Sequence, residues 1–390
     1  SGREYHQEEK IGEDKMSKKY LMTPGPTPVP EDIRLEMAKP IIHHRTKEYQ
    51  AIFKEATEGL KKIFKTSNDL FTFTSSGTGA MEASVVNVLS PGDKIIVVRG
   101  GKFGERFGDI AKAYGVEVIA IDVEWGTGPK PEVIKDILKK NPGVTAVYTT
   151  LCETSTATVF DIKAIGEVVR ATDALFVVDA ISGLGADDFE NDKWGVDIAV
   201  CGSQKGLMIP PGLAFCSVSE KAWKAVETSR LPKFYFNFKK YKKAWLDMDT
   251  PFTSAITLVI GLKKAIERIN AQGIDSVIAE HSSQARAFRE ACKAIGLAIF
   301  SKSPSSGVTA VNTPAGMNAD DLVKLLKTEF GVTFAPGQEH LKGKIFRCAH
   351  MGGIDREHTV EAIKALEMAL SKSGHKFTVG AGVVAAEKIL

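Results

Sequence analysis

The sequence has few cysteines, little net charge and no long apolar run. Its five cysteines, among 390 residues, show no CxxC spacing, which argues against both a disulfide framework and a zinc site. No apolar run approaches the roughly eighteen residues that a membrane helix needs. The N-terminal fifteen residues are too polar for a secretory signal. We therefore expect a cytoplasmic protein that binds neither a metal nor a membrane.

Charge gives no general reason to expect a nucleic acid as partner. The 51 basic and 48 acidic residues are spread along the chain and leave a net charge of +3. One basic cluster, residues 233–243 (KFYFNFKKYKK), carries interleaved aromatic residues that would suit base stacking. We favour instead a loop near a phosphate-bearing cofactor or at a subunit contact, so no nucleic acid is expected.

Composition indicates a globular chain with room for two cores. The residues are 43% hydrophobic and 25% charged, which is ordinary for soluble domains. Beyond about Gln272 the pattern changes to helices that alternate with short strands. We interpret residues 16–272 as a large domain with an N-terminal arm and residues 273–390 as a smaller C-terminal domain. Residues 1–15 are interpreted as a tag or a disordered extension.

Two short apolar runs end abruptly in polar residues. Residues 175–178 are followed by Asp179, and residues 196–200 are followed closely by Lys205. Continuous runs of this kind are typical of strands buried on both faces of a parallel sheet, where ligands gather at the carboxyl ends of the strands. The sequence therefore predicts one carboxylate and one amine at the same edge of the sheet.

An acid and a lysine on neighbouring strand ends suit pyridoxal 5'-phosphate. That coenzyme needs a lysine to hold its aldehyde as a Schiff base and a carboxylate to keep its ring nitrogen protonated. The alternative is a turn-capping aspartate beside an ordinary surface lysine. We favour the coenzyme and assign the catalytic roles to Lys205 and Asp179, because a phosphate site is also predicted.

The predicted phosphate site lies in an earlier turn. An apolar strand at 70–74 leads into small residues, and a helical segment follows at 80–89. A turn that opens a helix leaves free backbone N–H groups and the positive end of the helix dipole, which together bind a phosphate. Ser76, Gly77 and Thr78 are the expected cradle.

Residues 77–82 (GTGAME) also come within one residue of the dinucleotide fingerprint. That interpretation requires an acid at the end of the next strand for the ribose, whereas the strand at 95–98 is followed by Arg99. An arginine there would accommodate a 2′-phosphate. An NADP enzyme is therefore kept as a distant alternative.

Four segments together carry a family resemblance: PGPTPVP (24–30), ETST (153–156), VVDAISGLG (177–185) and GSQKG (202–206). With them the chain resembles the class V, fold type I aminotransferases, specifically the serine-pyruvate and alanine-glyoxylate aminotransferase family. The resemblance covers about residues 20–372 and includes homologues described as the small subunit of a soluble hydrogenase. It implies an α/β fold with a mostly parallel seven-stranded sheet between helices, plus a smaller α+β C-terminal domain.

The resemblance also implies roles for residues around the coenzyme. It places the Phe103 ring on one face of the pyridine and Ile181 on the opposite face. Thr154 approaches the phenolic oxygen, and Gln204 directly precedes the lysine. Relatives often have tryptophan at the position of Phe103, so phenylalanine implies a smaller stacking surface. They usually have glycine where Ala157 stands, so this turn must tolerate a side chain.

For the substrate, the resemblance implies two contacts. Gly25 brings backbone close to the substrate carboxylate, and Arg347 holds that carboxylate through a bidentate pair that a lysine could not imitate. Thr250 and Thr253 match positions that reach the phosphate of the neighbouring subunit's coenzyme. A homodimer with active sites at its interface is therefore expected, although a simple turn motif at these threonines is nearly as plausible.

The resulting hypothesis is a transferase that moves an amino group from alanine or serine to glyoxylate or pyruvate. Lys205, once released by the substrate, would shuttle the Cα proton. A cysteine desulfurase or another lyase of the same fold is an alternative, but Gln204 stands where desulfurases have histidine. A non-catalytic accessory subunit of a redox complex is the other alternative, and the joint presence of Lys205, Asp179 and Arg347 argues against it.

Overall fold

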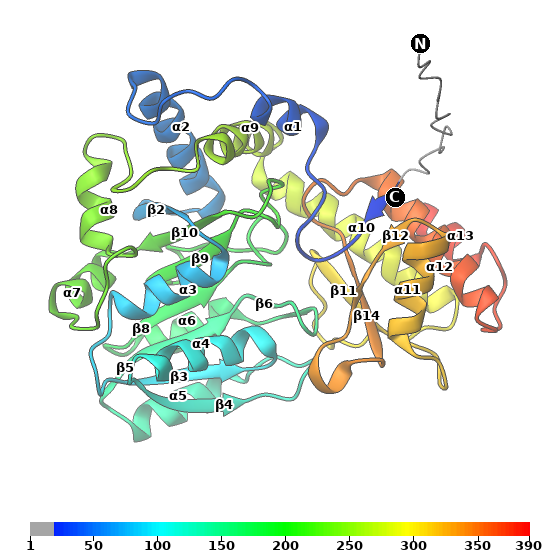
Figure 1. Ribbon diagram of the computed structural model, residues 1–390. Helices are drawn as coiled ribbons and strands as arrows, with labels where there is room; N and C mark the ends of the chain where they lie inside the picture. The colour runs from blue at the N-terminus through cyan, green and yellow to red at the C-terminus, as the bar shows by residue number, and fades with distance from the viewer. Residues whose placement is uncertain (1–18) are drawn as a thin grey trace, which may run out of the picture.

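The computed structural model describes residues 19–390 (Figure 1), so the interpretation of residues 1–15 falls outside the described part. The helices and strands follow the chain in this order: β1 (Tyr20–Leu21), α1 (Glu31–Met37), α2 (Lys47–Phe64), β2 (Asp69–Thr74), α3 (Gly77–Val86), β3 (Lys94–Arg99), α4 (Lys102–Ala113), β4 (Glu117–Asp122), α5 (Pro131–Lys140), β5 (Val144–Thr150), β6 (Cys152–Glu153), β7 (Thr158–Val159), α6 (Ile162–Arg170), β8 (Leu175–Asp179), β9 (Ile198–Gly202), β10 (Leu213–Val218), α7 (Glu220–Thr228), α8 (Phe238–Trp245), α9 (Ile256–Gln272), α10 (Ile274–Ala294), β11 (Val308–Asn312), α11 (Ala319–Glu329), β12 (Val332–Thr333), β13 (Ala335–Pro336), η1 (Glu339–Leu341), β14 (Ile345–Ala349), α12 (Arg356–Lys372) and α13 (Ala381–Glu387).

The larger layer is a seven-stranded sheet in the order β2-β10-β9-β8-β5-β3-β4. All neighbours pair in parallel except β10, which is antiparallel to both β2 and β9. Helices cover both faces of the sheet (Figure 1). The predicted mostly parallel seven-stranded sheet is therefore confirmed.

The strands are apolar along their whole length because both of their faces are buried. In β3, Ile96 and Val98 pack into the core beneath α2, α5, α6 and α9, while Ile95 and Val97 pack into the core beneath α3 and α4. A strand of this kind has no polar face, which explains why the sequence shows continuous apolar runs rather than alternation.

The smaller C-terminal layer is an antiparallel three-stranded sheet, β11-β14-β13, packed against long helices. The N-terminal strand β1 joins this part of the molecule by pairing in parallel with β12. The chain then crosses to the larger layer, where the Thr27 N–H donates to Gln204 O at 3.1 Å. The division at residues 272 and 273 stays a prediction.

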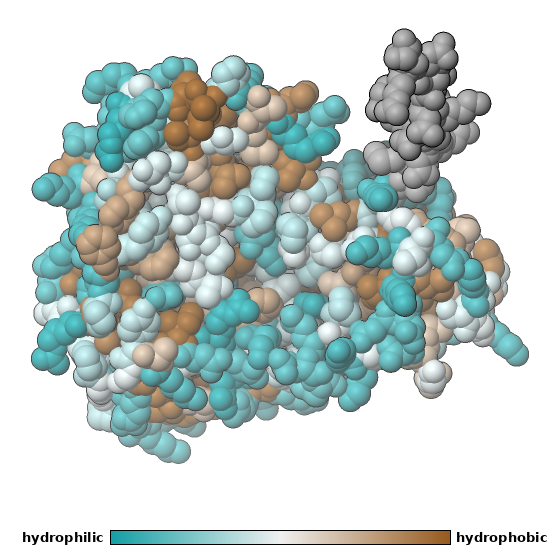
Figure 2. Space-filling view, in the orientation of Figure 1, coloured by the Kyte–Doolittle hydropathy of each residue, from teal (hydrophilic) through white to brown (hydrophobic). Residues whose placement is uncertain are grey.

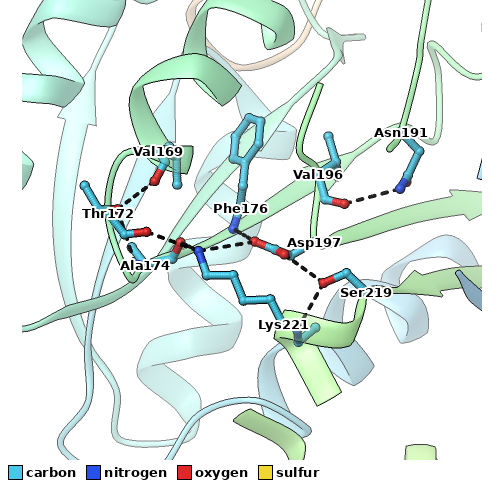
Figure 3. Close-up of polar contacts among 10 residues, drawn as sticks. Val169, Thr172, Ala174, Phe176, Asn191, Val196, Asp197, Ser219 and Lys221 are labelled. Atoms are coloured by element: carbon cyan, nitrogen blue, oxygen red, sulfur yellow. Dashed lines mark hydrogen bonds and ion pairs between the residues drawn. The ribbon is translucent and has the colours of Figure 1, made fainter. Parts of the chain in front are cut away.

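Asp197 fastens the amino ends of β8 and β9 (Figure 3). Its carboxylate accepts hydrogen bonds from Phe176 N at 2.9 Å and from Ser219 Oγ at 2.7 Å, and Lys221 Nζ lies 3.8 Å away. Both carboxylate oxygens therefore have partners from the protein itself. The two strands are thus fixed at the end opposite Asp179 and Lys205.

Two segments differ from what the sequence indicated. The helix expected at residues 80–89 is α3, which begins at Gly77 and ends at Val86, and the basic cluster contains α8 rather than a continuous loop. The C-terminal residues form α13, which packs against α10 and α12. The buried Glu367 accepts hydrogen bonds from Gly380 N at 2.7 Å and Gly382 N at 2.6 Å and so caps that helix.

No helix in the stretch 19–390 has both the length and the apolar character to span a bilayer.

Candidate active site

Lys205 lies in the loop that follows β9, and its side chain is buried. Its Nζ donates a hydrogen bond to the carbonyl of Pro24 in the N-terminal arm. A Cβ atom at Gly25 would overlap the end of the Lys205 side chain, so only glycine lets the arm approach this closely. The arm therefore lies directly on the predicted catalytic amine.

Asp179 is the last residue of β8, next to Val200 of β9. Its Oδ1 accepts a hydrogen bond from Ile181 N at 2.8 Å, and within residues 19–390 no hydrogen bond to Oδ2 is recorded. Burial raises the pKa of Asp179 to about 7. A buried carboxylate with one oxygen free favours a cationic or hydrogen-bond-donating partner.

The ammonium of Lys205 is disfavoured for the same physical reason. Burial, with a smaller contribution from the nearby positive charge of Arg347, lowers its pKa to about 8. With a pKa near 8 a fraction of the lysine is neutral at physiological pH, and that neutral amine can act as a nucleophile and as a base. Burial therefore raises the pKa of the acid and lowers the pKa of the amine, so that both groups titrate in the same pH range. Such paired shifts are typical of catalytic sites.

The predicted phosphate cradle is at the first turn of α3. Ser76 is the N-cap residue, and its side chain makes no capping hydrogen bond. A Cβ at Gly77 would lie 2.6 Å from Ile181 Cδ1, so the turn passes close to the loop after β8. Arg106 Nη1 donates to Thr78 Oγ1 at 3.1 Å. The helix end thus has open N–H groups beside a guanidinium, which suits a phosphate.

Phe103 and Ile181, the residues predicted on opposite faces of the ring, come from different elements. Phe103 is in the first turn of α4, and the guanidinium carbon of Arg106 lies 4.8 Å from the centre of its ring. Ile181 follows Asp179 by two residues and is buried. The Phe103 ring is therefore fixed by the position of the α4 terminus, and Ile181 by the end of β8.

Arg347 lies on β14 and is buried. Its Nη1 donates to Thr154 O at 2.8 Å and its Nη2 to Pro336 O at 2.9 Å. Within the described chain it forms no ion pair with a carboxylate. Burial lowers its pKa to about 10, so the guanidinium is charged at neutral pH. A buried cation held only by carbonyls is ready to bind a carboxylate from outside the chain.

Thr154 and Gln204 are close to these groups. Thr154 Oγ1 shares a hydrogen bond with Ser182 Oγ, in the loop that follows Asp179. Gln204 Oε1 is buried and has no hydrogen-bond partner in the part of the chain that the structure describes. Ala157, where the resemblance implies glycine, is buried with φ 58, a left-handed conformation that costs a non-glycine residue roughly 1 kcal/mol.

Thr250 and Thr253 are not brought to Lys205 by any contact within one described chain. Thr250 Oγ1 donates to Phe252 O at 2.7 Å, and Thr253 is exposed. Ala255 N donates to Thr74 Oγ1 at 3.2 Å, which holds this loop against the carboxyl end of β2. Their predicted role at a neighbouring subunit's coenzyme is not tested by a single chain.

Sequence reasoning missed two contributions to this site. Arg106 was not assigned a role, because only the structure shows that residues 102–106 belong to a helix, on which Arg106 lies one turn after Phe103. The contact of the Pro24 carbonyl with Lys205 joins residues 181 positions apart, and no local pattern could reveal it.

The residues fit pyridoxal phosphate. An open helix end beside Arg106 suits its phosphate, and the free oxygen of Asp179 suits a protonated ring nitrogen. The Lys205 amine suits its aldehyde, and the orphaned Gln204 Oε1 offers one more polar contact. In the described residues, no group of three or more His, Cys, Asp or Glu side chains is placed to hold a metal ion.

Three curated relatives match nearly the whole chain. A protein of Synechococcus sp. (strain PCC 6716) named "Soluble hydrogenase, small subunit" is 42% identical over 96% of this chain and 98% of its own length. The L-aspartate–glyoxylate aminotransferase of Paracoccus denitrificans is 36% identical, covering 95% and 96%. The serine–glyoxylate aminotransferase of Methylorubrum extorquens is 35% identical, also covering 95% and 96%.

Among solved structures, the ureidoglycine-glyoxylate aminotransferase of Bacillus subtilis superposes with a TM-score of 0.91 at 28% identity, covering 96% of this chain and 98% of its own. The fold predicted from the sequence is therefore confirmed in its type as well as in its sheet. The sequence model of the family described as "Aminotransferase class-V" matches residues 20–350. The chain belongs to the class-V aminotransferase family.

Proposed function

We propose that this protein is a pyridoxal-phosphate-dependent aminotransferase that moves an amino group from a small L-amino acid, alanine or serine, to glyoxylate or pyruvate. The observation that carries the proposal is that Lys205 and Asp179 interact electrostatically at the carboxyl ends of β8 and β9, with the glycine-bearing arm lying against Lys205. Membership of the class-V aminotransferases supports the same reaction.

The cofactor-binding residues divide by the part of the coenzyme that they hold. Ser76, Gly77 and Thr78 would bind the phosphate, and Asp179 would accept a hydrogen bond from the ring nitrogen. Phe103 and Ile181 would cover the two ring faces, while Thr154 and Gln204 would contact its polar edge. When bound, the coenzyme supplies an electron-accepting ring that makes the substrate Cα–H bond acidic.

Lys205 is the residue that moves the proton. Lys205 would hold the coenzyme at its aldehyde. Its amine, when free, would act as the base that accepts the proton from the substrate Cα, because burial lowers its pKa to about 8. The cover formed by Pro24 and Gly25 would keep bulk water from this amine.

Arg347 would bind the α-carboxylate of the amino donor, with Gly25 beside it. A single buried guanidinium held by carbonyl groups suits a small monocarboxylate donor. Glyoxylate as acceptor is supported by the names of the Paracoccus, Methylorubrum and Bacillus proteins. The Paracoccus protein is named for aspartate, so aspartate is the donor against which alanine and serine must be compared.

A homodimer is part of the proposal. Phe234 and Leu246, on either side of α8, are 71% and 78% exposed, and Lys240 Nζ lies 3.7 Å above the Phe234 ring. Figure 2 shows apolar patches along the upper edge of the larger layer, among α1, α2 and α9. A second copy that covers both this edge and α8 would shield these side chains and bring Thr250 and Thr253 to the coenzyme of its partner.

We also propose a cytoplasmic location. The five cysteines are free and buried in the described chain, which suits a reducing compartment. Burial raises the pKa of Cys152 well above its ordinary value, and the same cause raises the pKa of Cys348. Buried thiols of this kind do not act as the nucleophile that a desulfurase needs, which supports the aminotransferase over that alternative.

The test is a visible absorption spectrum of the purified protein with pyridoxal phosphate. We expect a coenzyme band that alanine or serine abolishes and glyoxylate restores, and whose attachment to Lys205 is trapped by borohydride and located by mass spectrometry. Lys205→Ala should bind coenzyme without covalent attachment. A protein that remains colourless, or one that only cysteine changes with release of sulfide, contradicts the proposal.

One relative's name favours a second candidate, an accessory subunit of a redox complex. That role predicts stable copurification with a redox enzyme and no response of the absorption spectrum to amino acids. The aminotransferase predicts the opposite result in both measurements. The same purified sample therefore separates the two candidates.

A further inference from the structure

The first turn of α4 is capped by residues from a distant loop. Gly101, its N-cap residue, has no side chain to offer, and the helix N–H groups turn instead to residues 153–155. Lys102 N donates to Ser155 Oγ at 3.1 Å, Phe103 N to Glu153 Oε2 at 3.1 Å and Gly104 N to the same oxygen at 2.9 Å. The neighbouring helix α3 has no such side-chain cap.

Glu153 is a buried carboxylate that accepts hydrogen bonds from backbone N–H groups and a hydroxyl. Besides the α4 N–H groups, it accepts from Ser155 Oγ at 2.6 Å and from Ser155 N at 3.2 Å. No lysine, arginine or histidine in the described chain forms an ion pair with it. A Cβ at Gly101 would lie 2.5 Å from its Cδ, so the loop and the helix end touch directly. The helix dipole and these donors stabilise the buried charge.

This contact joins the three parts of the proposed site. α4 carries Phe103, the predicted stacking residue, and Arg106, which donates to Thr78 in the phosphate cradle. The loop that supplies Glu153 also supplies the Thr154 carbonyl that accepts from Arg347 Nη1 at 2.8 Å. A shift of Glu153 would therefore move the coenzyme contacts and the substrate contact together.

We propose that Glu153 is a positioning residue for the transamination site, which sets the place of Phe103 relative to Arg347 by capping α4 from the neighbouring loop. The proposal rests on the proposed function, because Phe103 and Arg347 have their roles only with coenzyme and substrate. Glu153 itself touches neither. Its effect is transmitted through the α4 terminus and through the backbone of residue 154.

Glu367 provides a matched control. It too is a buried glutamate that caps the start of another helix from a distance, at Gly380 N and Gly382 N before α13. That cap is in the C-terminal layer, among helices α10, α12 and α13. Glutamine at either position removes the same charge from the same kind of contact, so a general effect on folding should be alike in both variants.

The experiment compares Glu153→Gln with Glu367→Gln in the holoenzyme. We expect both variants to unfold at lower temperature. Only Glu153→Gln should weaken coenzyme binding, by about tenfold, and raise the alanine or serine concentration for half-maximal conversion by a similar factor. Equal coenzyme and donor affinities in the two variants would overturn the proposal.

A double-mutant cycle separates positioning from a local loss of stability. Glu153→Gln and Arg347→Lys should be non-additive in donor affinity, because the first already displaces the carbonyl partner of Arg347. Glu367→Gln and Arg347→Lys should be additive. Additivity in both cycles would contradict the proposal. If Glu153→Gln does not fold, Ser155→Ala serves instead, with an expected threefold weakening of coenzyme binding; unchanged binding there overturns it.

The proposed function fails in a different way. A wild-type protein that binds no pyridoxal phosphate, or that binds it without response to amino acids, contradicts the aminotransferase itself. A wild-type enzyme that transaminates normally, with a Glu153→Gln variant changed only in unfolding temperature, contradicts only the role of Glu153.

Discussion

The two ends of strands β8 and β9 carry aspartates in contrasting surroundings. At the amino end, both oxygens of Asp197 accept hydrogen bonds from the chain, and Lys221 lies beside them (Figure 3). At the carboxyl end, Asp179 has one recorded hydrogen bond, and burial raises its pKa to about 7. At the amino end, where the polar groups hold the sheet together, they find their hydrogen-bond partners within the protein.

The same contrast extends to the residues around Asp179. Gln204 Oε1 is buried without a partner among residues 19–390, and Lys205 Nζ is held by a single carbonyl. Buried polar groups normally have their hydrogen bonds made within the protein, because leaving one unmade costs roughly 1–3 kcal/mol. We conclude that unmet hydrogen-bonding capacity distinguishes a site built for a ligand from one built for stability.

The largest expected effect is that of Asp179→Asn. With a protonated ring nitrogen no longer stabilised, kcat with alanine and glyoxylate should fall roughly 100- to 1,000-fold. The matched variant Asp197→Asn removes a carboxylate from the other end of the same strands and should leave kcat within about twofold. Equal losses in the two variants would show that the contrast between the ends has no functional meaning.

The Asp179 variant should also gain stability in the apoprotein. The folded pKa of about 7 lies above the ordinary value of 3.8, so the contribution of this group to stability is present below pH 3.8 and lost as pH rises through 7. At pH 8 the wild type has lost this stability because Asp179 is buried in its charged form, whereas the asparagine variant has no such charge. Urea midpoints at pH 8 and pH 4 measure it: the variant should be the more stable at pH 8, and the difference should shrink at pH 4.

The second expected effect concerns the open end of α3. Ser76→Asp would supply the side-chain cap that this helix lacks and would place a negative charge where the coenzyme phosphate is proposed to bind. Charge repulsion at close range should weaken coenzyme binding more than about 100-fold, while the apoprotein should be as stable as the wild type or more so. Ser76→Ala is the control and should change binding by less than about tenfold.

A binding titration followed by coenzyme fluorescence or absorbance measures the affinity. If Ser76→Asp binds pyridoxal phosphate as tightly as Ser76→Ala, the phosphate does not lie at the α3 terminus. The proposed cradle of Ser76, Gly77 and Thr78 would then be wrong, even if covalent attachment at Lys205 is found.

The third expected effect is a pH dependence. Burial lowers the pKa of Lys205 to about 8, and only its neutral amine attacks an aldehyde. The rate of covalent coenzyme attachment should rise about tenfold per pH unit below pH 8 and level off above it. An ordinary lysine would keep gaining rate towards its pKa near 10.4. Rapid-mixing absorbance from pH 6 to pH 10 gives the profile, and a rise that continues through pH 10 contradicts a buried, depressed amine.

Much of this contrast could be predicted from the sequence, because it follows from local patterns. Residues 175–178 are apolar without interruption and Asp179 ends the run, which indicates a doubly buried strand with a polar terminus. The small residues 75–79, which follow a strand and open a helix, likewise indicate an anion-binding site. These signals need only neighbouring residues and the rule that parallel strands end at one edge.

The rest depends on contacts between residues far apart in the chain. The start of α4 at Lys102 has no local signal, because its cap comes from Glu153 and Ser155, while Gly101 offers no side chain. The tail beyond residue 374 had no pattern of its own, since α13 depends on Glu367 for its cap and on α10 for packing. Local propensity cannot report an interaction whose partner lies outside the helix itself.

The smallest expected effect is on the stability of Asp197→Asn. Asparagine keeps one acceptor for Phe176 N but loses the charge that faces Ser219 and Lys221. Lys221 is partly exposed, so its share is small, and the variant should lose about 1–2 kcal/mol of unfolding free energy. Urea unfolding of the apoprotein measures it, with Lys221→Met as a control that should lose less than about 1 kcal/mol. A stable Asp197 variant with reduced kcat would reverse the assignment of the two ends, because the amino end of the strands would then act on the reaction and not on the fold.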